Sequence, residues 1–377
     1  MELLQRKDSW QDPSRYLKQI FIERSSSDDP YAAEIIGKAG LPVTIIEDTD
    51  YPEIIKGVYP ENLSEGKTVL LLSKNRGTFL KECPATREYQ CCDYRVINIG
   101  TGCPMDCTYC ILQAYLNNPY QNFYINEQDM FTELYNEIAK DTGFLRIGTG
   151  EFTDSMALDR LTGMSRKLIG FFSDKKNCIL ELKTKSAHIE NVRDLDHGGR
   201  TVMAWSLNSE KIVMQEEMRA ATIDERLEAA ALCSASGYHL AFHFDPIIAY
   251  PGWQQGYKDT IEKLFGKVPA SSIRWISLGA FRYIPKLKQI GTLRFPHSKI
   301  YHHEFIEGLD SKQRYFRPLR VELYRYIYSL IKRLADPRTC IYFCMESDEI
   351  WKEVMGFTPD EYGGLPRMLD CSVSSSN

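Results

Sequence analysis

Three cysteines lie close together in the chain: Cys103, Cys107 and Cys110, in a C-x3-C-x2-C spacing. Thiolates at this spacing can bind three corners of a cubane 4Fe-4S cluster, which leaves the fourth iron without a protein ligand. An open iron can chelate the amine and carboxylate of S-adenosylmethionine (SAM), and the reduced cluster can then cleave the sulfonium to a 5'-deoxyadenosyl radical. The spacing therefore predicts a 4Fe-4S cluster that does chemistry on SAM.

Two plainer interpretations of these cysteines stay open. Zinc prefers four ligands, commonly as two separated pairs, and no second pair follows nearby. The chain has eleven cysteines, so a chance group of buried structural thiols is the other alternative. An aromatic residue, Tyr109, directly precedes Cys110, and with it the run resembles the signature of radical SAM enzymes. This favours the cluster over both alternatives.

The elements that must position this loop form a repeating pattern. From Arg95 onward, short apolar runs alternate with longer amphipathic runs. Strands are predicted at 95–99, 144–148, 178–183, 201–207, 239–245 and 273–278, and helices at 130–140, 159–172, 187–195, 224–236 and 257–265. Six βα units in a row predict a parallel sheet, and its binding loops lie at the carboxyl ends of the strands. The fold class is therefore α/β, a partial (β/α)6 barrel.

Regions on both sides of this barrel differ from it. Residues 1–94 are predicted to form an N-terminal α/β extension, with a helix at 29–38 and strands at 42–47 and 68–73. The barrel domain is predicted at 95–283. Residues 284–377 form a basic, aromatic-rich C-terminal region with a helix at 321–333 and a strand at 339–344, and this region is the candidate DNA-binding domain.

Polar residues follow several predicted strands and are candidates for holding SAM. Glu151 comes after a Gly-Thr-Gly run, where the backbone allows close approach and a carboxylate can accept hydrogen bonds from the ammonium of SAM. Lys185, Ser206 and Asn208 offer a cation, a hydroxyl and an amide at the next two strand ends. His243, after the fifth strand, is at least as well explained as a core histidine.

With these residues, the chain resembles the spore photoproduct lyase family of radical SAM enzymes. The similarity runs in order through the cluster run with Leu112 and Gln113, then through 152–154, 158–162, 183–185, 205–209, 224–230, 237–238, 246–247 and 252–257. The resemblance implies a lyase that abstracts hydrogen from a methylene-bridged thymine dimer in DNA. It also implies that Cys103, Cys107 and Cys110 bind the cluster, that Thr153, Lys185 and Ser206 hold SAM, and that Arg317 contacts the lesion.

The chain departs from the family at two positions. The resemblance implies a cysteine that returns hydrogen to the product radical, but the matching position is Glu151. It also implies a tyrosine on each side of the third cluster cysteine for radical relay. Tyr109 is present and is the candidate catalytic residue, whereas the second position holds Ile111. Cys178 or Cys233 is a possible substitute donor. Five further cysteines are expected to be packing residues rather than a second metal site: Cys83, Cys91, Cys92, Cys340 and Cys344.

Charge is unevenly distributed. The whole chain carries a net charge of -5, yet the segment from Phe281 to Leu334 contains twelve lysines and arginines against four acidic residues, with ten aromatics among them. Cations can neutralise phosphates and aromatic rings can stack on an extruded base, so DNA is the expected partner. A solvated basic helix that packs its tyrosines on the barrel is the alternative.

Composition bounds the remaining expectations. No apolar leader and no membrane-length apolar run are visible, and an odd number of unevenly spaced cysteines favours the reducing cytoplasm. An electron donor such as flavodoxin or ferredoxin is expected to reduce the cluster. The sequence thus predicts a radical SAM lyase that acts on a thymine photoproduct. A radical SAM enzyme for another substrate and a non-catalytic, metal-stabilised nucleic-acid-binding protein remain alternatives.

Overall fold

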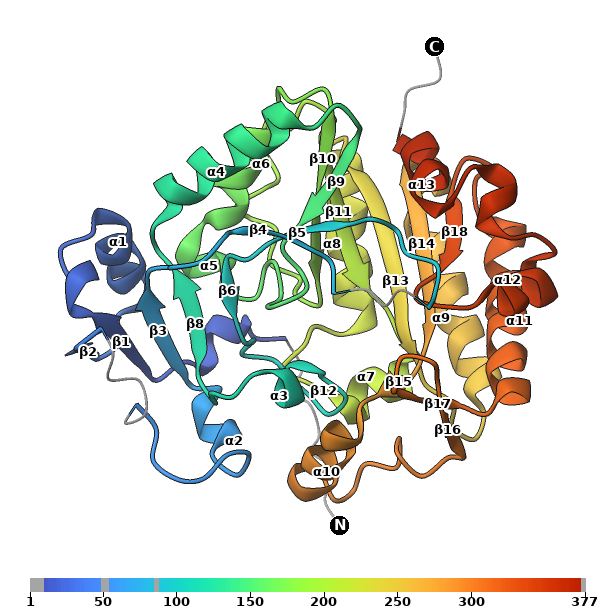
Figure 1. Ribbon diagram of the computed structural model, residues 1–377, viewed down its shortest axis with the longest axis horizontal. Coiled ribbons are helices and arrows are strands. Elements are labelled where there is room, and N and C mark those ends of the chain that lie inside the picture. The colour runs from blue at the N-terminus through green and yellow to red at the C-terminus, as the bar shows by residue number, and fades with distance from the viewer. Residues whose placement is uncertain (1–9, 49–53, 85–87, 374–377) are drawn as a thin grey trace.

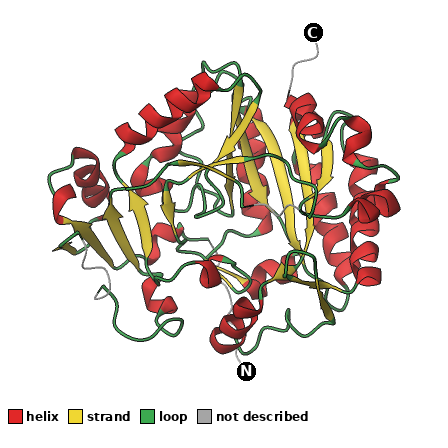
Figure 2. Ribbon diagram, viewed as in Figure 1, coloured by secondary structure: helices red, strands yellow, loops and turns green. Residues whose placement is uncertain are grey.

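A curved eight-stranded sheet organises the computed structural model, which describes residues 10–48, 54–84 and 88–373 (Figures 1 and 2). Along the sheet the strands are β18 (Cys340–Phe343), β14 (Ile273–Ala280), β13 (His239–Ile247), β11 (Thr201–Ser206), β10 (Cys178–Thr184), β9 (Leu145–Gly148), β5 (Arg95–Ile97) and β4 (Leu80–Glu82). Neighbouring strands are parallel except for β4 and β5. The six predicted barrel strands all form, which confirms the partial barrel, and the predicted strand at 339–344 extends the sheet as β18.

Helices cover the outer face of this sheet (Figure 2). They are α4 (Glu127–Lys140), α5 (Asp159–Thr162), α6 (Met164–Phe172), α8 (Ile223–Ala235), α9 (Trp253–Lys267) and α11 (Arg317–Leu334). Local sequence explains their ends. Thr222 and Glu225 form a reciprocal capping box that starts α8. The predicted helix at 159–172 is broken by Gly163, which has a φ of +60° and separates α5 from α6.

One predicted helix is wrong. Residues 187–195 form turns instead of a helix. The Ser186 amide donates to the Thr184 hydroxyl, and the His188 amide donates to the Ser186 hydroxyl. Such local side-chain acceptors compete with helical hydrogen bonds, so they favour a turn over a first helical turn.

A second, five-stranded sheet forms the N-terminal layer, at the left of Figure 1. Its order is β2 (Val43–Ile46), β1 (Gln19–Glu23), β3 (Val69–Ser73), β8 (Gln121–Tyr124) and β6 (Gly100–Thr101), with α1 (Pro30–Ala39) and α2 (Leu63–Gly66). The predicted helix and strands of this layer are therefore present. Strands β8 and β6 come from beyond residue 94, so the sheet crosses the predicted domain boundary.

The remaining elements pack with the two sheets around one large core, and a second, small cluster of Ile54, Ile55, Val69, Leu71 and Tyr120 lies apart from it. The C-terminal region adds a three-stranded antiparallel sheet of β15 (Arg282–Tyr283), β17 (Gln313–Tyr315) and β16 (Phe305–Glu307), together with α10 (Pro285–Arg294), α12 (Asp348–Met355) and α13 (Leu365–Val373). Shorter elements are β7 (Asp106–Cys107), α3 (Leu112–Tyr115), α7 (Glu210–Glu216), β12 (Glu217–Met218) and the 3-10 helices at Pro13–Tyr16, Arg24–Ser26, Ala270–Ser272 and Pro359–Tyr362. In the described part of the chain, no helix has the length and apolarity needed to cross a bilayer.

Candidate active site

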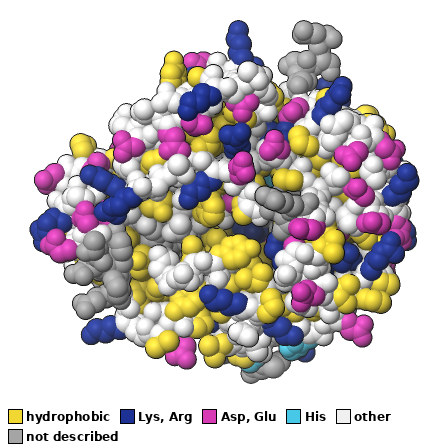
Figure 3. Space-filling view, viewed as in Figure 1, with side chains coloured by type: hydrophobic (Ala, Val, Ile, Leu, Met, Phe, Trp, Pro, Cys, Tyr) yellow, Lys and Arg dark blue, Asp and Glu magenta, His cyan; other side chains and the backbone are white. Residues whose placement is uncertain are grey.

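The three cysteines of the C-x3-C-x2-C run face one cavity of about 360 Å³. They lie on the loop between β6 and α3, which starts at Gly102 with a φ of +84°. At Gly102 a Cβ atom would approach the Tyr120 carbonyl to 3.2 Å, so glycine fits both the turn and the space. Hydrophobic side chains gather around the middle of the face seen in Figure 3, and Tyr115, half exposed, lines the cavity.

The donor set suits a cubane rather than a single ion. In the described ranges, no three His, Cys, Asp or Glu side chains converge on one ion position. A 4Fe-4S cluster does not need such convergence, because each thiolate binds a different iron. Cys103, Cys107 and Cys110 share one loop and one cavity, and they fit three corners of a cluster.

Buried side chains fix the cluster loop to the segment around β12. Strand β7 pairs with β12, and the Thr108 hydroxyl donates to Glu216 at 2.5 Å. The Tyr109 phenol donates to Glu217, whose other carboxylate oxygen binds Arg226 at 2.5 Å. Burial would raise the pKa of Glu217, but Arg226 lowers it below its usual value. The carboxylate therefore stays ionised, and it holds the phenol beside the cluster cysteines.

The predicted SAM residues lie mostly in the same cavity. Glu151, Thr153, Lys185 and Ser206 line it. Asn208 does not: its amide donates to the Pro246 carbonyl at 2.7 Å and accepts from the Tyr257 hydroxyl at 2.6 Å. The structure therefore gives Asn208 a packing role at the base of the β13 loop, and its assignment to SAM lacks geometric support.

Asp154 is a cavity residue that the strand-end argument missed. Its carboxylate accepts from the amides of Met156 and Ala157 at 2.9 Å each, and from the Thr184 hydroxyl at 2.6 Å. It also accepts from the Lys185 amide at 2.9 Å. Asp154 thus joins the ends of β9 and β10, which keeps Thr153 and Lys185 at one edge of the cavity. Its position after a glycine-rich strand end was the available signal.

Glu151 already has a cationic partner. The Lys183 ammonium lies 2.5 Å from the Glu151 carboxylate, and both side chains line the cavity. Burial alone would lower the pKa of Lys183, but Glu151 and Glu181 raise it above its usual value. Glu181 in turn accepts from Trp275 at 2.9 Å and binds His243 at 2.8 Å. His243 is thus a hydrogen-bonded member of the cavity floor.

Four thiols also line the cavity: Cys83, Cys91, Cys92 and Cys344. Burial and, to a smaller extent, the negative charge of Glu151 raise the pKa of the Cys83 thiol. Burial and, to a smaller extent, the negative charge of Asp245 raise the pKa of Cys344 to about 12. Both therefore keep their S–H bond at neutral pH. The proposed substitutes Cys178 and Cys233 are buried and lie outside the cavity lining, so they cannot meet a radical formed there. Cys340 is also buried outside it.

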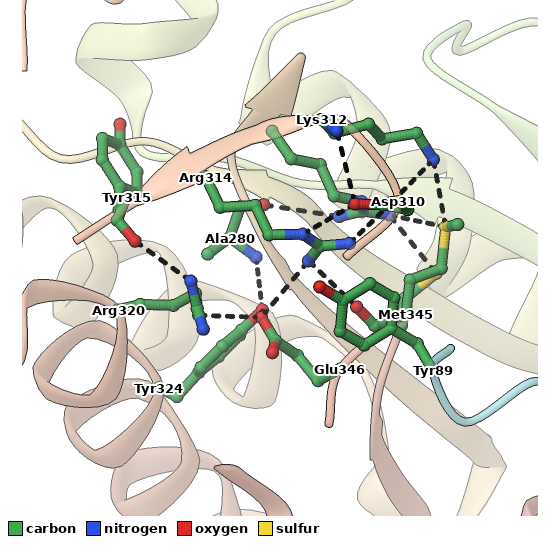
Figure 4. Close-up of polar contacts among 12 residues, drawn as sticks. Tyr89, Ala280, Asp310, Lys312, Arg314, Tyr315, Arg320, Tyr324, Met345 and Glu346 are labelled. Atoms are coloured by element: carbon green, nitrogen blue, oxygen red, sulfur yellow. Dashed lines mark hydrogen bonds and ion pairs between the residues drawn. The ribbon is translucent and has the colours of Figure 1, made fainter. Parts of the chain in front are cut away.

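Five of the twelve cations of the basic segment form ion pairs inside the molecule: Arg282, Arg294, Lys312, Arg314 and Arg320. Figure 4 shows Arg314 between Asp310 and Glu346, with Arg320 also directed at Glu346. Arg282 binds Asp245 through two contacts of 3.1 Å, and Arg294 binds Asp106 of the cluster loop. On the face seen in Figure 3, cations are interspersed with carboxylates. Sequence charge therefore overstated the basic surface, because some of its cations pair with Asp310 of the same segment and others with carboxylates outside it.

Arg317 lies at the first residue of α11, outside the lining of the cavity. Its guanidinium pairs with Glu353 at 2.6 Å, and its side chain is about half exposed. It is therefore a surface cation with a weak partner. The predicted contact of Arg317 to a lesion would therefore lie on the surface outside the cavity.

Comparisons with known proteins agree with this architecture. The family model described as "Spore photoproduct lyase" matches residues 85–338. Curated spore photoproduct lyases from Geobacillus sp. (strain Y412MC61) and Bacillus subtilis (strain 168) are each 25% identical, over 320 and 318 residues. These alignments cover 82% of this chain and 90% and 89% of the relatives.

Solved structures give the same fold. The structure titled "Spore photoproduct lyase complexed with dinucleoside spore photoproduct" has a TM-score of 0.78 at 23% identity. A double mutant of the lyase "with bound AdoMet and dinucleoside spore photoproduct" also has a TM-score of 0.78 at 23% identity. Each alignment covers 87% of this chain and 99% of the other. With the family model matching two thirds of its length, the chain belongs to the spore photoproduct lyase family of radical SAM enzymes.

Proposed function

We propose that this protein is a radical SAM repair lyase that acts on a thymine photoproduct in DNA. The observation that carries the proposal is the single cavity shared by three cluster cysteines, polar strand ends and free thiols. Its relatives are spore photoproduct lyases, and related structures are described with AdoMet and a dinucleoside photoproduct. All eleven cysteines lie in the described ranges and none of them forms a disulfide, which suits a reducing cytoplasm.

The residues divide into two tasks. Cys103, Cys107 and Cys110 would hold a 4Fe-4S cluster, which when bound and reduced would supply the electron that splits SAM into methionine and a 5'-deoxyadenosyl radical. Thr153, Lys185 and Ser206 offer a hydroxyl, a cation and a second hydroxyl to SAM. Glu151 can share its carboxylate between Lys183 and the ammonium of SAM, since a carboxylate accepts several hydrogen bonds.

The thiols that line the cavity are the proposed donors of hydrogen to the product radical. Cys83 and Cys344 line the same cavity as Glu151, the position where the family resemblance implies a donor cysteine. A thiol S–H gives its hydrogen atom to the product radical and becomes a thiyl radical. One electron from the flavodoxin or ferredoxin and one proton from water restore the thiol. Tyr109, which lines the cavity and donates to Glu217, is the proposed relay for this electron.

Two partners follow from this assignment. A flavodoxin or ferredoxin is the proposed electron donor, because reduction of the cluster needs a one-electron protein donor of low potential. DNA is the proposed substrate carrier, held by surface cations that include Arg317.

The test is anaerobic turnover. Reconstituted protein, reduced with dithionite, is incubated with SAM and a dinucleoside spore photoproduct, and thymidine and 5'-deoxyadenosine are measured together. Recovery of thymidine is expected. A 5'-deoxyadenosine signal without thymidine would instead support a radical SAM enzyme for another substrate, which Glu151 and Ile111 favour.

The donor assignment has its own test. Cys83→Ala with Cys344→Ala is expected to leave SAM cleavage intact while thymidine is replaced by adducts of the unquenched product radical. Glu151→Cys places a thiol at the family position but removes a carboxylate proposed to bind SAM, so in that double variant it is expected to restore thymidine per SAM cleaved, with a lower rate of SAM cleavage. Cys178→Ala is the matched control outside the cavity. Unchanged thymidine yield in the double variant would rule out Cys83 and Cys344.

A further inference from the structure

Two buried cations, one from the N-terminal layer and one from α10 in the C-terminal region, contact the cluster loop. Lys67 follows α2 in the N-terminal layer and is only 6% exposed. Its ammonium donates to the Cys103 carbonyl at 2.7 Å and to the Met105 carbonyl at 2.9 Å. Arg294, at the end of α10, contacts the same loop through Asp106.

The Arg294 contacts form a connected network. Its guanidinium donates to both carboxylate oxygens of Asp106, at 3.1 and 2.9 Å, and to the side-chain carbonyl of Gln113. Gln113 then donates to the Cys107 carbonyl at 3.0 Å. Lys67 also lies 4.0 Å from Asp106. The backbone of the loop is therefore held on both sides of Cys107.

Lys67 is itself held in place. The carbonyl of Gly66 accepts from Gln121 on β8 at 3.0 Å. At Gly66 a Cβ atom would lie 2.1 Å from the Pro119 carbonyl, so only glycine permits this close approach. The position of the ammonium is thus fixed by the N-terminal layer. Lys67 lies outside residues 85–338, the part that matches the family model.

We infer that Lys67 and Arg294 are positioning residues that hold the cluster loop and whose charges favour the reduced state of the cluster. Reduction adds one negative charge at the cluster, and nearby buried cations stabilise added negative charge. Asp106 offsets part of this effect for both cations, but it lies 2.9 Å from Arg294 and 4.0 Å from Lys67. Lys67 donates its hydrogen bonds to neutral carbonyls, so Lys67 contributes more. The inference gives the N-terminal layer a direct part in the active site, and it rests on the proposed cluster.

The experiment compares Lys67→Met and Arg294→Gln with Lys140→Met, which removes a charge at an exposed site. After anaerobic reconstitution, the midpoint potential is measured by redox titration followed by EPR. The rate of iron loss to a chelator is measured in parallel, without SAM. The two loop variants are expected to shift the potential to more negative values, Lys67→Met by more. Iron loss is expected to be about 10-fold faster, as for other substitutions behind metal ligands.

A purely structural role would speed iron loss and leave the potential where it is in the wild type. That result, or unchanged values of both, overturns the inference. Where Lys67→Met does not fold, the single variants Lys67→Arg and Arg294→Gln still test the inference. The substituted arginine keeps the charge of Lys67, so only the Arg294 change is then expected to shift the potential. A wild-type protein that binds no cluster would contradict the proposed function instead, so the two failures are distinguishable.

Discussion

Two walls of the same cavity differ in how their residues are distributed along the sequence. The cluster wall, formed by Cys103, Cys107 and Cys110, comes from one short run of sequence and agrees with the motif prediction. The strand-end wall, which includes Glu151, Lys183, Arg282 and Cys344, collects residues from several strands and loops. In the proposed function, the cluster wall generates the radical, and the strand-end wall carries the residues proposed to bind SAM and to return hydrogen.

The largest effect is expected from breaking the cluster wall. Cys107→Ala removes one of three thiolates, so the protein should lose iron after reconstitution and lose SAM cleavage by orders of magnitude. Iron analysis and 5'-deoxyadenosine assays measure both. Cys233→Ala, a buried thiol on α8 outside the cavity, is the control. Full iron content in Cys107→Ala would show that the cubane is bound by other residues.

The support of the cluster wall is the next target. Arg226→Met leaves Glu217 buried without its cation, and Glu217 is 1% exposed. Breaking a buried pair in this way should lower the free energy of unfolding by about 3–5 kcal/mol. Urea unfolding of the apoprotein measures it. A loss below about 1 kcal/mol would mean that Glu217 gains another partner.

The strand-end wall should be more tolerant. Arg282→Met removes the partner of Asp245, whose side chain keeps 26% of its surface exposed. Water can replace part of the lost contact, so we expect a loss of about 2 kcal/mol, below the range for fully buried pairs. The same urea experiment tests it. An effect as large as that of Arg226→Met would erase the distinction between the walls.

Low pH should reduce the stability of the folded protein through protonation of Glu217, which supports the cluster wall. Its pKa in the folded protein is lowered below the ordinary value of 4.5. Its contribution to stability is therefore complete above pH 4.5 and is lost as pH falls through the lowered pKa. Unfolding midpoints between pH 3 and 7 should fall more steeply below pH 4.5 for the wild type than for Glu217→Gln. Parallel curves would assign the acid sensitivity to other carboxylates.

The smallest effect is expected outside the cavity. Arg317→Ala removes a half-exposed cation that pairs with Glu353. Binding to photoproduct-containing DNA should weaken slightly, and the slope of log affinity against log salt should fall by about one. Fluorescence anisotropy over a salt series measures this, with Arg338→Ala, a surface cation at the end of the family match, as comparison. An unchanged slope would remove Arg317 from the DNA surface.

Pattern and periodicity carried most of the fold. The alternation of apolar and amphipathic runs predicted all six barrel strands, because buried parallel strands need continuous apolar residues. It failed at 187–195, where hydroxyl side chains bind the backbone and a turn replaces the helix. The basic segment misled for another reason. Residues such as Asp245 and Glu346 that neutralise it are distant in sequence.

The sequence by itself determined the cluster loop and the family, because three thiolates and their spacing are local properties of one run. Only the tertiary structure decided which distant side chains hold that loop and which thiols share the cavity with it. Lys67, Arg294 and the thiols Cys83 and Cys344 come from segments more than two hundred residues apart. Local spacing carries no information on such contacts, since they arise only when the two sheets and the C-terminal region pack around one core.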